Sequence, residues 1–170
     1  KMLAALAAFE WTYAGGPSGA CAELALRALA GGELIAADNG GVLPIAAAMT
    51  LAMADRDETV DVWQDAFADA HRHGSLFAIG GIRLWHGFTL YRRGELAEAA
   101  EELEASLDDF ALWGFSAHAG VYVGAMLTHS LVEQGDLHGA RRALERADPD
   151  VSTDGARFWL NAQIDLLVAE

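Results

Sequence analysis

Six histidines are the residues that first suggest a metal or acid–base site. His71 and His73 stand two positions apart, a spacing that places them on different faces of a helix. His118 and His129 are 11 positions apart, so they can share a helix face but lie too far apart to bind one ion. Because no His-x3-His pair occurs, the histidines do not predict a transition-metal site.

Two runs of acidic residues suggest calcium binding or catalysis by paired carboxylates. Spacings of three and four positions put several of the carboxylates on one helix face. The chain has neither the glycine turn and ligand order of a calcium loop nor a DDxxD-like motif. We therefore predict a solvated outer face for both runs, which are Asp55, Asp57, Glu58, Asp61, Asp65 and Asp69, and Glu95, Glu98, Glu101, Glu102 and Glu104.

The scarcity of lysine and cysteine excludes several kinds of reaction. Lys1 is the only lysine, which leaves no P-loop, Schiff-base or basic catalytic lysine inside the fold. Cys21 is the only cysteine, which excludes an internal disulfide and a cysteine-built zinc or iron–sulfur site. Since no catalytic spacing is recognisable either, we expect the chain not to be an enzyme and to hold no cofactor or metal.

The charge balance indicates which partners the chain avoids. It has 11 lysines and arginines against 25 acidic residues, a net charge of -14. Such a chain repels phosphate backbones and anionic lipids, so we predict no contact with nucleic acid or membrane. A single cysteine fits a reducing compartment, so we predict a cytoplasmic location. The chain's longest apolar run, 42–54, is shorter than the roughly 20 residues that span a bilayer.

The basic cluster of Arg141, Arg142 and Arg146 is expected to form salt bridges to Glu145 or to the next repeat.

A repeat of about 40 residues organises the chain. Gly94 and Gly135 each separate an apolar segment from an alanine-rich one, and they are 41 positions apart. Passages at Ala54 and Gly15 continue this spacing toward the N-terminus. A small residue stands five positions after each of these four residues, and a larger residue stands nine positions after each. Positions four apart lie on one helix face. These pairs are Ala20 and Leu24, Thr59 and Trp63, Ala99 and Leu103, and Ala140 and Leu144.

The repeat predicts helical hairpins. First helices are expected near 2–14, 41–54, 76–93, 117–134 and 154–169, and second helices near 17–31, 58–73, 95–113 and 136–147. Ser75 and Ser116 suit helix N-caps, and Thr153 or Asp154 suits the start of the last helix. No window alternates with period two, so no sheet is expected. We predict a single all-α repeat domain over 1–170 with about four and a half antiparallel hairpins, part of a longer multidomain protein.

The hairpin pattern resembles the tetratricopeptide repeat. The phrases LYRRGELAEAAEELEASL, LVEQGDLHGARRALERA and ADRDETVD…AFADAHRHGS are typical of the longer repeats found in large ATP-binding LuxR-family transcriptional regulators of high-GC bacteria. Arg83 and His86 depart from the tetratricopeptide consensus, which has a large apolar residue there. The resemblance implies a right-handed α-solenoid that regulates transcription, with ATP bound only in a separate domain and DNA in another. The alternative is a free-standing tetratricopeptide-like adaptor unrelated to transcription.

The resemblance also implies a concave groove lined by the first helices. A protein, a peptide or a small-molecule effector is expected to bind there. Its residues would be Phe9, Tyr13, Leu84, Phe88, Tyr91, Arg92, Tyr122, His129 and Glu133. The alternative is that Phe88 and Tyr122 pack adjacent repeats. We expect the large rings of Trp63, Trp85, Trp113 and Trp159 in the core.

The last predicted helix has no partner helix after it. Residues 156–168 are apolar on much of their expected surface. Exposed apolar surface of this kind favours association, so we predict a possible homodimer through the terminal repeats.

Overall fold

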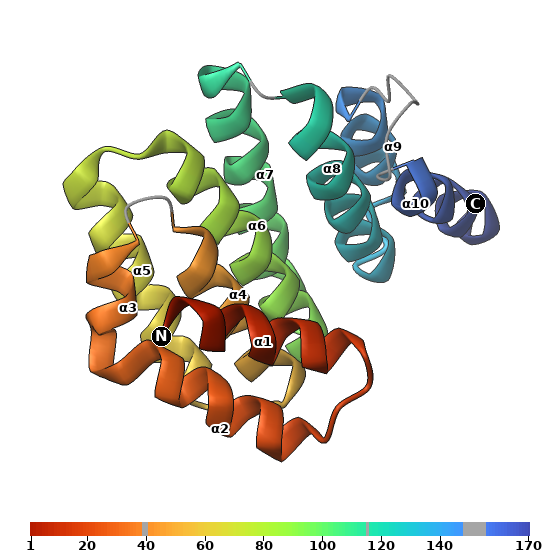
Figure 1. The fold of residues 1–170 in the computed structure, drawn as a ribbon. Coiled ribbons are helices and arrows are strands. Elements are labelled where there is room, and N and C mark those ends of the chain that lie inside the picture. Colours follow the sequence, from red (N-terminus) through yellow and green to blue (C-terminus); the bar gives the residue numbers. More distant parts are fainter. Residues whose placement is uncertain (39–40, 115, 148–155) are drawn as a thin grey trace. The chain divides into compact units, whose positions relative to one another are not determined.

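The computed structural model describes residues 1–38, 41–114, 116–147 and 156–170, and it is all-α, with no strand among them (Figure 1). The helices are α1 (Met2–Tyr13), α2 (Ser18–Leu29), the 3-10 turn η1 (Ala30–Gly32), α3 (Glu33–Ala37), α4 (Val42–Met53), α5 (Thr59–His73), α6 (Leu76–Arg93), α7 (Leu96–Trp113), α8 (Ser116–Glu133), α9 (Leu137–Arg146) and α10 (Ala156–Ala169). Every predicted helix is present within a few residues of its expected bounds. No helix in these ranges is long and apolar enough to cross a bilayer.

The short helix α3 is the element that the repeat pattern did not predict. Its five residues lie between η1 and the start of α4, outside the predicted helices. Leu34 and Ile35 of α3 are buried against neighbouring helices. A single helical turn is too short for a periodic pattern, so sequence reasoning had no signal for it.

Side-chain caps mark several helix starts. The predicted cap at Ser75 is confirmed, since its hydroxyl accepts a hydrogen bond from the Ala78 amide at 3.3 Å. Asp136 caps α9 in the same way, accepting from the Gly139 amide at 2.8 Å. The side chain of Ser116, and both Thr153 and Asp154, lie outside the described part of the chain.

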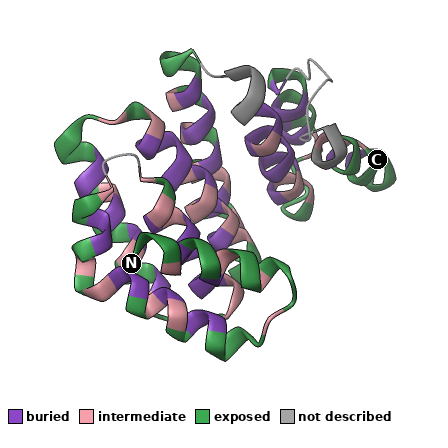
Figure 2. Cartoon of the chain, in the orientation of Figure 1, coloured by how far each residue is buried: buried purple, intermediate pink, exposed green. Residues whose placement is uncertain are grey.

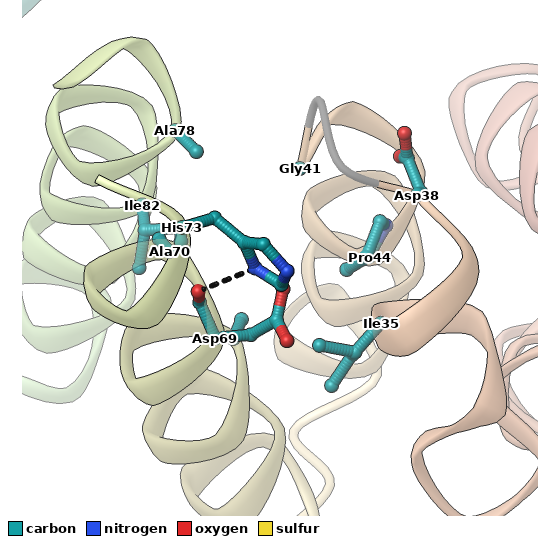
Figure 3. A pocket seen from close by; sticks show the side chains of 10 residues that line it. Ile35, Asp38, Gly41, Pro44, Asp69, Ala70, His73, Ala78 and Ile82 are labelled. Atoms are coloured by element: carbon teal, nitrogen blue, oxygen red, sulfur yellow. Dashed lines mark hydrogen bonds and ion pairs between the residues drawn. The ribbon is translucent and has the colours of Figure 1, made fainter. Parts of the chain in front are cut away.

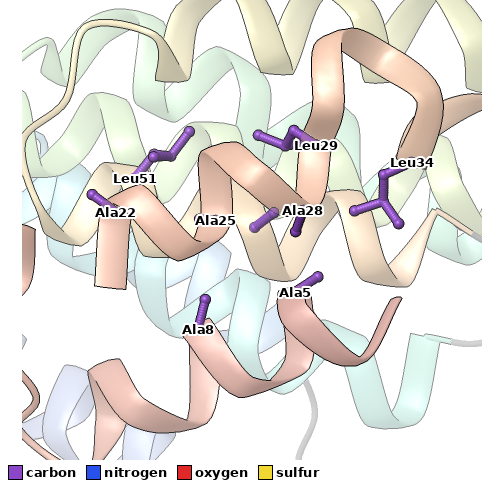
Figure 4. Close-up of a cluster of buried hydrophobic side chains, with 9 residues drawn as sticks. Ala5, Ala8, Ala22, Ala25, Ala28, Leu29, Leu34 and Leu51 are labelled. Atoms are coloured by element: carbon purple, nitrogen blue, oxygen red, sulfur yellow. The ribbon is translucent and has the colours of Figure 1, made fainter. Parts of the chain in front are cut away.

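The chain divides into two compact units, residues 1–85 and 86–170. In the first unit, α1 packs against α2 and α4, α2 packs against α4, and α4 packs against α5. Figure 4 shows the small side chains at this junction. Ala5, Ala8, Ala22 and Ala25 are fully buried, and such small residues let helix backbones approach closely. Leu51 fills the space beside them.

In the second unit, α8 lies at the centre and contacts α7, α9 and α10. Ser130 of α8 donates a hydrogen bond to the Leu96 carbonyl of α7 at 2.9 Å. A buried cluster joins α8 and α9 to α10 and includes Ala125, Leu144 and Leu166. These contacts fix α8 and α10, two of the three helices that carry the site described below.

The predicted repeat register is confirmed in three of the four repeats. The small residues Thr59, Ala99 and Ala140 are fully buried, and their larger partners, Trp63, Leu103 and Leu144, are buried beside them. In the first repeat the register is wrong by one position, because Ala20 is exposed whereas Cys21 and Ala25 are buried. The cause is one additional turn residue: α2 begins three residues after Gly15, whereas α7 begins two after Gly94.

The four tryptophans that were expected in the core differ in their exposure. Trp63 is buried as predicted, whereas Trp85 and Trp159 are half-buried. Trp113 is 44% exposed, so its assignment to the core was wrong; it ends α7, where fewer neighbours cover it.

The predicted apolar surface of α10 is present, and Val168 is 81% exposed. Figure 2 shows the large exposed share of both α1 and α10.

Candidate functional site

A groove of about 500 Å³ is the largest hollow described in the unit of residues 86–170. Three helices line it: α6, α8 and α10. Its lining consists of two aromatic rings, two apolar side chains and three polar groups. These are Phe88, Tyr91, Met126, Ile164, His129, Asn161 and Asp165.

Helical spacing explains why these residues meet. Each helix contributes side chains three or four positions apart, which is the spacing of neighbours on one helix face. The helices are held in turn by contacts on their other faces. Gln134, directly after α8, donates to the Leu96 carbonyl of α7 at 2.9 Å, and the Trp159 indole N–H of α10 donates to the Leu144 carbonyl of α9 at 3.5 Å. These bonds hold α8 and α10 in place on the sides that face away from the groove.

One close polar contact crosses the groove. The Nδ1 atom of His129 on α8 lies 3.0 Å from the Oδ2 atom of Asp165 on α10. The His129 side chain is 25% exposed and that of Asp165 is 54% exposed, so the carboxylate reaches solvent while the imidazole orients it. Among the described side chains that line the groove there is no serine, threonine or cysteine to act as a nucleophile beside this pair. The lining is suited to binding.

Burial raises the pKa of the Tyr91 phenol above its ordinary value, and the negative charges of Glu133 and Asp165 raise it further. We expect Asp165→Asn or Glu133→Gln to lower this pKa, because each removes a charge that opposes the phenolate. Ultraviolet absorbance titration checks this, with a Tyr91→Phe protein subtracted to isolate the one ring. An unchanged Tyr91 pKa in both variants would show that the two carboxylates do not act on the groove.

The structure brings together three of the predicted groove residues, Phe88, Tyr91 and His129. Leu84 was wrongly placed there, since it is 6% exposed and belongs to the core of residues 1–85. Phe9 and Tyr13 also lie in that unit, where their ring centroids are 4.7 Å apart.

The other three predicted residues lie on the helices that carry the groove but do not line it. Arg92 and Glu133 are exposed near the ends of α6 and α8, and Tyr122 is half-buried on α8. Glu133 still acts on the groove through its charge, as the pKa of Tyr91 indicates.

Sequence reasoning missed four lining residues: Met126, Asn161, Ile164 and Asp165. Three of them lie on α10. The prediction named no groove residue on this helix. The usable signal was the spacing of Asn161, Ile164 and Asp165 on one face of a predicted helix.

A second cavity lies inside the unit of residues 1–85, between α3, α4, α5 and the first part of α6 (Figure 3). Its volume is about 10 Å³, which is room for about one water molecule. Asp69 borders it and is buried, contrary to the solvated face predicted for its acidic run. Arg72 donates to its Oδ1 atom at 2.8 Å, and His73 Nδ1 lies 3.2 Å from its Oδ2 atom. These partners explain how a carboxylate is buried here.

The arginine cluster is used in salt bridges. Arg146 of α9 contacts Asp108 at 2.7 Å and Glu104 at 3.5 Å, both on α7. Arg141 pairs with Glu170, which confirms the expected bridge toward the next hairpin. The expected bridge to Glu145 is absent from the salt bridges described for these residues.

Within the described residues, no group of three or more histidine, cysteine, aspartate or glutamate side chains is placed to hold a metal ion. The groove on α6, α8 and α10 is consequently the arrangement with the clearest capacity to bind a ligand. No family model, curated protein or solved structure matches the chain.

Proposed function

We propose that residues 1–170 form a tetratricopeptide-like solenoid that serves as the effector- or partner-binding region of a LuxR-family transcriptional regulator. The observation that carries the proposal is the composition of the groove. Its walls are α6, α8 and α10, which are the first helices of three successive predicted hairpins. In a solenoid of hairpins the corresponding helices of each repeat form one continuous binding surface.

The helix contacts support the same architecture. First helices of successive hairpins pack together, α1 with α4 and α8 with α10. Each also packs against the second helix before or after it, as α8 does with α7 and α9. A hairpin that cannot bury its apolar face alone is stabilised by this kind of stacking.

The groove acts by binding. Aromatic rings with a few polar groups are the usual lining of a site for a peptide or a small molecule. Ligand binding would shift the parent regulator between two states only to the extent that the ligand prefers one of them. ATP hydrolysis and DNA contact belong to other domains of that parent protein, and this acidic segment remains in the cytoplasm.

A free-standing adaptor with the same fold is the alternative function. The groove would then bind a partner protein without any link to transcription. The reading frame on both sides of these residues separates the two proposals, because the regulator requires an ATPase domain and a helix-turn-helix domain there.

The test of the groove is selection from a random peptide library with the 170-residue chain as bait, followed by titration of the selected peptides. We expect Phe88→Ala with Tyr91→Ala to weaken binding by about 30-fold or more, because loss of even one buried aromatic anchor costs about 2 kcal/mol or more. Trp113→Ala, which truncates an exposed ring outside the groove, is the control. Unchanged affinity in the double variant, with helicity preserved by circular dichroism, would refute the groove as the binding site.

A further inference from the structure

We propose that the groove on α6, α8 and α10 selects a basic peptide and takes the cationic end of an arginine or lysine side chain between Tyr91, Phe88 and Asp165. This inference rests on the proposed binding function and names the ligand class.

The charge of the lining is the first reason. Among the side chains that the structure describes, no lysine or arginine lines the groove, and Asp165 is its one acidic residue. The Asp165 side chain is 54% exposed, so its carboxylate reaches solvent while its Oδ2 atom lies 3.0 Å from Nδ1 of His129. Glu133 adds a second negative charge close enough to act on the Tyr91 phenol. A groove with negatively charged residues in and near its lining, in a chain of net charge -14, attracts cations and repels anions.

The aromatic rings are the second reason. Phe88 and Tyr91 stand three positions apart on α6, so both lie on the helix face that lines the groove. An arginine or lysine head group within about 6 Å of an aromatic ring centre is attracted to the face of that ring. A cationic head group in the groove would therefore be attracted both by the Asp165 carboxylate and by the faces of the two rings.

The apolar residues and the volume are the third reason. Met126 and Ile164 also line the groove, and they can pack against the aliphatic stem of a long basic side chain. The volume of about 500 Å³ falls within the range of roughly 300–1,000 Å³ that is usual for ligand sites. It accommodates one such side chain with part of the backbone on either side, which favours a peptide over a simple metal cation.

The test compares three peptides that differ at one position, acetyl-Leu-X-Leu-amide with X as arginine, citrulline or glutamate. Citrulline has nearly the shape of arginine but no charge. Each is titrated into the ¹⁵N-labelled 170-residue chain, and the amide shifts of α6, α8 and α10 are followed. We expect the arginine peptide to bind about 10-fold more tightly than the citrulline peptide, since a charge-assisted contact is about twice as strong as a neutral one. The glutamate peptide should bind most weakly.

Two variants identify the source of the preference. Asp165→Asn should reduce the affinity for the arginine peptide by about 10-fold and leave the citrulline peptide unchanged. Glu133→Gln should act in the same direction with a smaller effect. Glu145→Gln removes the same charge from an exposed position on α9 outside the groove, and it should change neither affinity.

The outcomes separate the two proposals. Equal binding of arginine and citrulline peptides, or an Asp165→Asn effect that is equal for both, overturns the selection of a cation but keeps the groove as a binding site. If none of the three peptides shifts the groove amides, the groove as a peptide site is itself refuted. Preference for arginine that disappears in Asp165→Asn establishes the inference.

Discussion

Replacing Gly124 with alanine is expected to destabilise the protein by about 1–3 kcal/mol, the usual cost of overpacking a core. Gly124 lies where α8 crosses α9. A Cβ atom added there would overlap the Cβ of Ala147, and it would lie 3.3 Å from the Ala143 carbonyl oxygen and 3.4 Å from the Ala147 Cα. Because these neighbours are backbone atoms or a methyl group, no flexible side chain can move aside. The helices must separate instead.

A matched control lies one turn earlier on the same helix. At Gly120 the nearest atoms to an added Cβ are 4.0 Å away, which is an ordinary contact. Gly120→Ala should therefore show only the helix-propensity gain of up to about 1 kcal/mol. Urea denaturation followed by circular dichroism measures both variants. The close approach of α8 and α9 is contradicted if the two substitutions shift the midpoint in the same direction.

The bounds of the longer helices could be predicted because particular residue types mark where each helix begins and ends. Glycine turns such as Gly94 and Gly135 separate segments whose apolar residues recur at helical spacing. The small residues five positions later, Ala99 and Ala140, mark the buried face and are fully buried. Information of this kind is local, so a single sequence contains it.

Features that depend on distant contacts could not be predicted. Asp69 follows the spacing of an acidic outer face, yet α5 turns it toward α3 and α4, where Arg72 and His73 satisfy its carboxylate. Helix α3 has too few residues for a pattern and is stabilised by the burial of Leu34 and Ile35. In both cases tertiary packing determines the outcome.

The candidate site also combines residues that the repeat pattern predicted with residues that only the packing of the helices reveals. Phe88, Tyr91 and His129 were predicted because the repeat register places them on the first helices. Leu84 shares that register, but it belongs to the other compact unit and is buried there. The spacing of Asp165 with Asn161 and Ile164 marks one face of α10, but only the packing of α10 against α8 shows that Asp165 contacts His129.

A substitution at Leu103 is expected to have the largest effect on stability. Leu103 of α7 is fully buried, and truncation to alanine removes its packing and leaves a cavity. We expect Leu103→Ala to lower the free energy of unfolding by about 2–5 kcal/mol. Urea denaturation measures the loss, and Leu112→Ala, at a position 77% exposed on the same helix, is the control that should change little.

The contact partner of Leu103 makes a second, compensating substitution possible. A Cβ atom added at Gly87 on α6 would lie 2.7 Å from Leu103 Cγ and 3.0 Å from its Cδ2. Gly87→Ala alone should therefore destabilise the protein, whereas in the Leu103→Ala background the added methyl group enters the space that the leucine vacated. There it should stabilise by a few tenths to about 1 kcal/mol, because alanine also favours the helix.

The double-mutant cycle distinguishes packing from helix propensity. Propensity depends on α6 alone, so it would make Gly87→Ala equally stabilising with and without Leu103. Direct contact requires the sign of the Gly87→Ala effect to reverse between the two backgrounds. The distances at Gly87 favour that reversal, since Leu103 supplies the two nearest atoms and the third, the Ala99 carbonyl oxygen, lies at 3.3 Å and must give way only by a few tenths of an ångström. A sign that does not change would mean that α6 and α7 are not in contact at this position.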